Sequence, residues 1–346
     1  MPSFNRLPFE IKQLIVKEVY LSDISSHVEE NVPVFFRKDN FFTPSDFKNG
    51  VAPTQSSIAS VTLVNKQMHS ICKEFLCRVL DLRGLTANDR RIYEDLTTHI
   101  NRYQQYIRSV ICPLIAFQQA WLDYHKEMLG HQKSALEWAE RVIQTLDTLA
   151  KSTTIKKIEL NLAFLPPAQD SSKPIIHHPL TQQTLDCVSK FQNLTTFGIT
   201  TDTHLKVPED MVLSAIGQMT HLESISLHNI SKRSSELELL HAELGPSDTD
   251  TDTTIHPEEF IFTQLTHLVL SGFSLEEDVL FLFKSCPLVM NASIHSPNIR
   301  AHSVTSLIKY WPQLSTLDVN VRGGKGSIDL ILYCSRNGIQ LDEAFY

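Results

Sequence analysis

The residues near position 250 have the types and spacing most suggestive of chemistry. Acidic side chains recur there at positions that match the ligands of a calcium-binding loop. They are Asp248, Asp250, Asp252 and Glu259. Thr253 stands where such a loop needs glycine for its sharp turn, and Pro257 lies inside the loop. We therefore expect a solvated acidic loop that binds no calcium.

A glycine-rich turn, VRGGKGSID at 321–329, is a second candidate site. It follows an expected strand and opens an expected helix, so its backbone amides could cradle a phosphate. It lacks the spacing of the P-loop motif, and glycines also make ordinary strand-to-helix turns. Because of this turn, a phosphate-handling protein of the enzyme class is one alternative for the function of the chain.

The fifteen histidines form no metal-binding motif such as HExxH. His177 and His178 stand together in a proline-flanked segment that has the composition of a loop. No Ser/His/Asp or Cys/His set and no glycine-flanked nucleophile can be assembled from the sequence. We expect no enzyme active site, no metal and no cofactor.

The composition of the 346 residues indicates a folded chain, because 42% are hydrophobic and 20% charged. A net charge of -8 with scattered basic residues predicts no nucleic-acid partner. No signal-like segment and no membrane span is visible, so we expect an intracellular protein of the cytoplasm or the nucleus. The six cysteines are widely spaced and are expected to be reduced, packed thiols.

Two amphipathic helices are expected at the N-terminal end. The first lies in FNRLPFEIKQLIVKEV at 4–19, where Pro8 suits a first helical turn and apolar residues follow at helical spacing. Residues 22–57 have no periodicity and are interpreted as an inserted loop. A second apolar stripe begins at 57 and continues to 82, so a helix is expected there.

The LPFEI sequence at 7–11 and the later LVNKQMHSI resemble an F-box, with an insertion longer than usual between them. Met68 stands where many members have an aromatic residue. The resemblance implies that residues 1–84 form a head that docks on a Skp-type adaptor and, through it, on a cullin. The positions implied for adaptor binding are Leu7, Pro8, Ile11, Leu14, Ile15, Val64 and Met68.

A repeated pattern of apolar residues dominates the rest of the chain. Six segments share it and predict short strands, most of them preceded by an expected helix. They are IKKIEL at 155–160, LTTFGI at 194–199, LESISL at 222–227, LTHLVL at 265–270, VMNASI at 289–294 and LSTLDV at 314–319. The last two intervals, 24 and 25 residues, fall within the period of leucine-rich repeats.

Short strands that alternate with helices bury their apolar sides only by stacking on their neighbours. We therefore predict an α/β chain with a helical head at 1–84 and a curved parallel-sheet solenoid at 85–346. Loops are expected at 165–179 and 244–259, and residues 86–150 are expected to form an atypical first repeat with a degenerate strand at 107–112. The repeats resemble the irregular leucine-rich repeats that follow an F-box.

Strand alternation predicts which side chains face away from the helices, on the concave side of the solenoid. Small hydroxyls, amides and histidines dominate there and suit a hydrogen-bonding surface for a target protein. The target-binding candidates are Ser224, Ser226, His228, His267, Ser271, Asn291, Ser293, His295, Asp318 and Asn320. Strand spacing places the histidines too far apart to share a zinc ion.

Together the head and the repeats resemble the substrate-recognition subunit of a Skp-cullin-F-box ubiquitin ligase. Such a subunit brings a target close to an enzyme carried by its partners and needs no catalytic residues of its own. The alternative is a repeat scaffold, not linked to ubiquitin, whose N-terminal helices only cap the solenoid.

Overall fold

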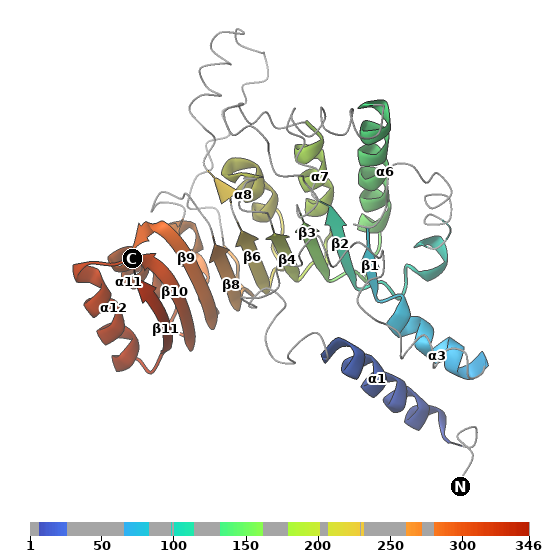
Figure 1. Ribbon diagram of the computed structural model, residues 1–346, viewed down its shortest axis with the longest axis horizontal. Helices are drawn as coiled ribbons and strands as arrows, with labels where there is room; N and C mark the ends of the chain where they lie inside the picture. The colour runs from blue at the N-terminus through green and yellow to red at the C-terminus, as the bar shows by residue number, and fades with distance from the viewer. Residues whose placement is uncertain are drawn as a thin grey trace.

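The structure is a computed structural model that describes residues 7–25, 66–82, 98, 100–113, 132–161, 179–200, 207–228, 230–231, 261–271 and 280–345. A nine-stranded sheet runs through it (Figure 1). All of its neighbouring strands are parallel. In spatial order they are β1 (Val79–Asp81), β2 (Ser109–Pro113), β3 (Lys157–Asn161), β4 (Thr196–Thr200), β6 (Ser224–His228), β8 (His267–Ser271), β9 (Asn291–Arg300), β10 (Thr316–Arg322) and β11 (Gln340–Phe345).

The spatial order of the strands is also their chain order, so each strand is added beside the preceding one. The first residues of β8, β9, β10 and β11 are 24 or 25 residues apart. A separate pair is formed by β5 (Val207–Pro208) and β7 (Ile230–Ser231). The predicted α/β class with a solenoid-like parallel sheet is confirmed.

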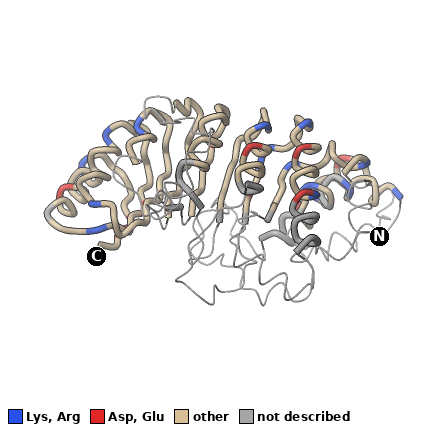
Figure 2. Tube along the Cα trace, turned by 90° about the horizontal axis from the view of Figure 1, so that it is seen from above, with Lys and Arg blue, Asp and Glu red and all other residues tan. Residues whose placement is uncertain are grey.

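Helices lie along one side of this sheet, in a row that Figure 2 shows as a shallow arc. They are α6 (Gln132–Ala150), α7 (Pro179–Ser189), α8 (Glu209–Gly217), α11 (Ala301–Ile308) and α12 (Lys325–Arg336). Between β8 and β9 the chain forms a short 3-10 helix, η5 (Phe281–Ser285). A parallel strand must return to the same end of the sheet, and these helices make the return.

The core lies between the helices and the sheet. Along β10, for example, Leu317, Val319 and Val321 are buried while the residues between them are not. Buried side chains of successive repeats join into one continuous cluster from Leu80 to Ile339. The fully buried Trp311 also donates a hydrogen bond from its Nε1 to the Phe283 carbonyl at 2.9 Å.

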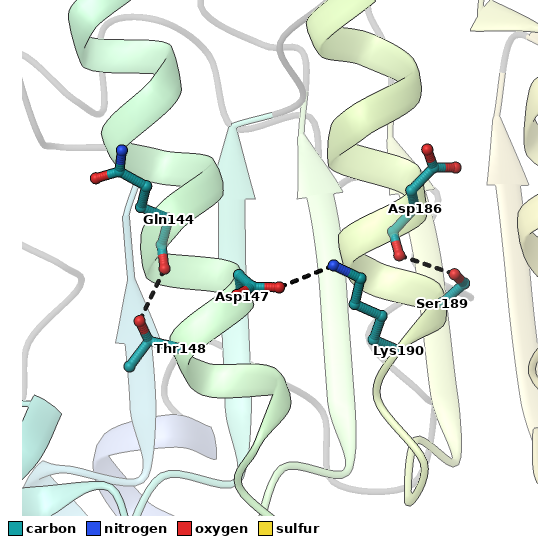
Figure 3. Close-up of polar contacts among 6 residues, drawn as sticks. All are labelled: Gln144, Asp147, Thr148, Asp186, Ser189 and Lys190. Atoms are coloured by element: carbon teal, nitrogen blue, oxygen red, sulfur yellow. Dashed lines mark hydrogen bonds and ion pairs between the residues drawn. The ribbon is translucent and has the colours of Figure 1, made fainter.

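The helices are additionally linked on their outer surface. Lys190, just after α7, donates from Nζ to Asp147 Oδ1 of α6 at 2.8 Å (Figure 3). This contact lowers the pKa of the Asp147 carboxyl and raises the pKa of the Lys190 ammonium. Both side chains are about half exposed, so the ion pair is a minor stabilising contact.

The cysteines behave as expected. All six are free, and every one except Cys77 is buried. Burial raises the pKa of the Cys334 thiol to about 11 and that of Cys286 to about 12, so both thiols are protonated at neutral pH.

Each of the six predicted strands is present and begins two residues after the start of its apolar pattern. The degenerate strand expected at 107–112 is β2. The helix expected to reach residue 82 is wrong at its C-terminal end, because α3 (Lys66–Leu76) ends at Leu76 and the chain then enters β1. The sheet thus starts inside the segment expected to be head. Most of the two loops and all of the insertion from residue 26 onward lie outside the described residues.

Candidate functional site

The first candidate surface is on α1 (Phe9–Ser25), which packs against α3. The side of α1 turned toward α3 buries Lys12 and Val16, which are 3% and 0% exposed. The Lys12 Nζ donates a hydrogen bond to Gln67 Oε1 of α3 at 2.6 Å. One turn apart on the helix, Lys12 and Val16 define its contact side.

The residues of α3 that complete this packing are Met68, Ile71 and Cys72, all buried. They and Val16 are not members of the continuous cluster between sheet and helices. The head therefore packs around its own small group of side chains. The prediction that Met68 binds the adaptor directly needs correction, because Met68 is fully buried and its role is to support α1.

A second side of α1 leaves apolar residues at the surface. Ile11 and Leu14 are 41% and 54% exposed, and Pro8 is exposed just before the helix begins. Leu7 and Ile15 are half-buried. At 100° per residue Ile11, Leu14 and Ile15 form one stripe beside the buried side, and Leu7 and Pro8 come just before the helix. We call this set, Leu7, Pro8, Ile11, Leu14 and Ile15, the apolar stripe. Val64 lies outside the described residues.

The second candidate surface is the open face, which is the side of the sheet opposite to helices α6 to α12. Strand register places the candidates for target binding there in rows that cross the strands. One row is Ser224, His267, Asn291 and Thr316; the next is Ser226, Val269, Ser293 and Asp318; the third is His228, Ser271, His295 and Asn320. The prediction that these residues lie on one face of the sheet is confirmed.

Two hydroxyl-imidazole contacts lie within these rows. Ser226 Oγ and His228 Nε2 are 2.9 Å apart on β6. On β9, Ser293 Oγ is 3.2 Å from His295 Nε2 and donates to Asp318 Oδ2 at 3.2 Å. The same His295 nitrogen is 2.9 Å from Asp318 Oδ2.

This Ser293, His295 and Asp318 set is not arranged as a nucleophilic relay. In such a relay the serine and the carboxylate engage different nitrogens of the imidazole. Here both oxygens approach Nε2, and the serine hydroxyl is also bonded to the carboxylate. The geometry therefore orients His295 on the sheet without preparing Ser293 to attack a substrate.

Burial dominates the electrostatics of the face. It lowers the pKa of His228 to about 4, with a smaller contribution from the neighbouring His295. Burial also lowers the pKa of His267, although Glu223 acts in the opposite direction. His228 is therefore a neutral imidazole at physiological pH.

The expectation that all ten candidates are accessible to a target is wrong for three of them. Ser224, Ser226 and Ser293 are 8%, 0% and 4% exposed. All three serines are too deep to contact a partner. Ser226 and Ser293 instead contact the imidazoles of His228 and His295 on their own strands.

The separation expected for the histidines is confirmed by the register. His228 pairs with Ser271 and Ser271 with His295, so the two histidines are two strands apart, while His267 is in the row of Ser224. Among the residues that the structure describes, no group of three or more His, Cys, Asp or Glu side chains could hold a metal ion. The acidic segment near residue 250 lies outside them.

The glycine-rich turn has a structural explanation. Gly324 precedes α12 with φ of 118°, a conformation that favours glycine. A Cβ on Gly326 would be 2.8 Å from the backbone nitrogen of His302, so glycine lets α12 approach the start of α11. Gly324 thus serves the turn, and Gly326 serves the packing of α12 on α11.

Sequence reasoning missed the charged residues at the C-terminal end of the open face. Asp342 on β11 is in register with Asp318, and Arg322 of β10 with Arg300 of β9. The missed signal was the apolar alternation of Leu341 and Phe345, which pack on the core and leave Asp342 on the opposite side.

Comparison with known proteins yields no relative: no protein-family model matches the chain, and no curated protein matches it. None of the described helices has the length and apolar character needed to cross a membrane.

Proposed function

We propose that this chain is the substrate-recognition subunit of an SCF-type E3 ubiquitin ligase. Its α1 would dock on a Skp-type adaptor and its open face would hold a target protein. The observation that carries the proposal is the apolar stripe of α1, whose residues Ile11 and Leu14 are exposed although the adjoining side of the helix is already packed on α3.

The stripe supports docking because Ile11 and Leu14 stay exposed although another side of α1 already packs on α3. Burying Ile11 and Leu14 in a complex would remove two large, about half-exposed side chains from water. Full burial of such a side chain contributes roughly 1.5–3 kcal/mol. A helix that only capped the solenoid would turn its apolar side toward the continuous core, and Val16 does not join that core.

The one-sided sheet supports the second half of the proposal. Helices cover one face, while the other presents polar side chains from consecutive strands in register. An extended, repeated surface of this kind is typical of solenoids that bind proteins. Transfer of ubiquitin would then depend on proximity and on enzymes brought by the adaptor and the cullin.

The proposal is tested by co-purification with a recombinant Skp-type adaptor. The variant Ile11→Asp with Leu14→Asp places two charges in the apolar stripe and should lose the adaptor entirely. The alanine variant Leu7→Ala with Pro8→Ala should weaken retention. Circular dichroism and the melting temperature should stay near wild type, because these positions are exposed or half-buried.

A matched control is available on α12, where Ile328 and Leu332 are 64% and 45% exposed. Ile328→Asp with Leu332→Asp introduces the same charges at comparable exposure and should leave adaptor binding unchanged. Failure of the wild-type chain to retain any Skp-type adaptor would instead favour a repeat scaffold not linked to ubiquitin.

A further inference from the structure

We propose that the C-terminal part of the open face, on β9, β10 and β11, binds an extended protein segment with one basic and one acidic side chain about 13 Å apart. The inference deepens the proposed function, because it names the charge pattern of the target. It rests on that function in one respect, namely that the ligand is a protein.

The basic side chain of the segment would lie over two carboxylates. Asp318 and Asp342 are direct partners on adjacent parallel strands, so their side chains leave the sheet on the same face. Asp342 is exposed, and Asp318 is 36% exposed beside His295. Like charges directly across neighbouring strands are destabilising. A bound ammonium or guanidinium would relieve this repulsion.

The acidic side chain would lie over two guanidinium groups. Arg322 and Arg300 are partners on adjacent strands, just beyond a shift in register that follows Val321, and both are exposed. The alternation of β10 continues to Arg322, which places it on the open face with Asp318. Within the described parts of the chain, neither arginine belongs to an ion pair. A carboxylate or phosphate can bridge two guanidinium groups through bidentate hydrogen bonds.

Asn320 lies between the two charged pairs on β10. Its Oδ1 is buried and has no hydrogen-bond partner. On β11 its neighbour in register is Ala344, a small residue that leaves room above the sheet. The bound segment would pass over this residue between the two charged pairs.

Spacing favours an extended segment as the occupant. Asp318 and Arg322 are four residues apart on one strand, which corresponds to about 13 Å at roughly 3.3 Å per residue. In an extended peptide, residues four apart lie on the same side at the same spacing. The order of the charged pairs therefore requires the basic and acidic residues of the segment to be four positions apart.

The test is a titration of the full chain with fluorescein-labelled Ser/Thr peptides, followed by fluorescence anisotropy. One peptide carries arginine and glutamate four positions apart, and a control of the same composition carries them side by side. The spaced peptide should bind at least about tenfold more tightly than the control. Equal affinity for the two peptides would overturn the inference.

A charge-swap variant separates binding from folding. Asp342→Lys with Arg322→Glu converts both like-charge pairs into opposite-charge pairs without changing the net charge. It should melt at or above the wild-type temperature and yet bind the spaced peptide at least about tenfold more weakly. The milder pair Asp342→Asn with Arg322→Gln gives the same test should the swap not fold. Retained binding by either folded variant would contradict the proposed site.

Lys309→Glu with Asp329→Lys is the matched control, because it exchanges the same charges at exposed positions just after α11 and on α12. This variant should bind the spaced peptide as wild type does. Sedimentation showing a dimer that the charge swap dissociates would assign the face to a second copy of the chain and overturn the inference. The peptide assay needs no adaptor, so a failed adaptor pull-down overturns the proposed function alone.

Discussion

The head and the sheet both bury apolar side chains, but their candidate surfaces expose different kinds of residue. The α1–α3 pair buries a few side chains around Val16 and Met68 and leaves apolar residues at its surface. The sheet and its helices bury one continuous apolar cluster and leave polar residues on the open face. Exposed apolar residues are not confined to the head, because Ile328 and Leu332 of α12 are also exposed. What sets the head apart is that its exposed apolar residues lie on a helix packed outside the continuous core, which is the arrangement that our proposal of a docking surface explains.

The largest effect should come from breaking the sheet core. Trp311→Ala removes a fully buried side chain and its hydrogen bond to Phe283, which should cost about 3–5 kcal/mol of unfolding free energy. Urea denaturation measures this loss. Tyr310→Ala, at a neighbouring 54% exposed position, should stay within about 0.5 kcal/mol of wild type. Equal losses in both variants would show that this repeat is not packed as described.

A smaller effect on the whole chain should follow from the corresponding change in the head. Met68→Ala leaves a cavity beneath α1 and should cost the head roughly 2–5 kcal/mol. Because Met68 is outside the continuous core, the main unfolding transition of the sheet should move much less while adaptor retention falls. If the sheet transition instead shifted as much as that of the head, the two regions would have to unfold as one cooperative unit.

The open face should make stability depend on pH. The unfolded chain protonates His228 below about pH 6.5, while the folded chain resists protonation until about pH 4. Folding therefore loses stability as the pH falls through this window, by up to about 3 kcal/mol. His228→Gln should flatten the dependence measured by urea denaturation, leaving the contribution of the same sign from His267. An unchanged slope would mean that His228 is not buried as described.

The smallest effect should come from the outer surface of the helices. Lys190→Ala removes the exposed ion pair with Asp147, so the melting temperature should drop slightly at low salt. The difference from wild type should vanish at high ionic strength, where exposed charges are screened. A loss of melting temperature that does not depend on salt would contradict this and would show that Lys190 stabilises the helices by packing.

Much of the fold follows from local patterns in the sequence. The strands β3, β4, β6, β8, β9 and β10 were predictable because each carries the repeated apolar pattern, in most cases after an expected helix. The edge strands were not. In β1 three residues carry too short a signal, and in β11 charged residues interrupt the apolar pattern, so pairing with β2 and β10 creates these strands.

For the candidate sites, residue periodicity predicts which side of a helix or strand a residue is on, but not how deeply it is buried. Alternation places Ser226 and Ser293 on the open face, but their depth depends on the side chains of neighbouring strands. Helical spacing groups Met68 with the apolar residues of the head, but its burial depends on how α1 crosses α3. The two like-charge pairs arise from register between strands that are distant in sequence, which no local pattern encodes.

The central claim is that the head provides a docking surface separate from the sheet. Hydrogen exchange of the full chain with and without a Skp-type adaptor tests it most directly. The account predicts adaptor-dependent protection of amides in α1, and no change in β3 to β10. Absence of protection in α1, or protection spread over the sheet strands, would contradict it.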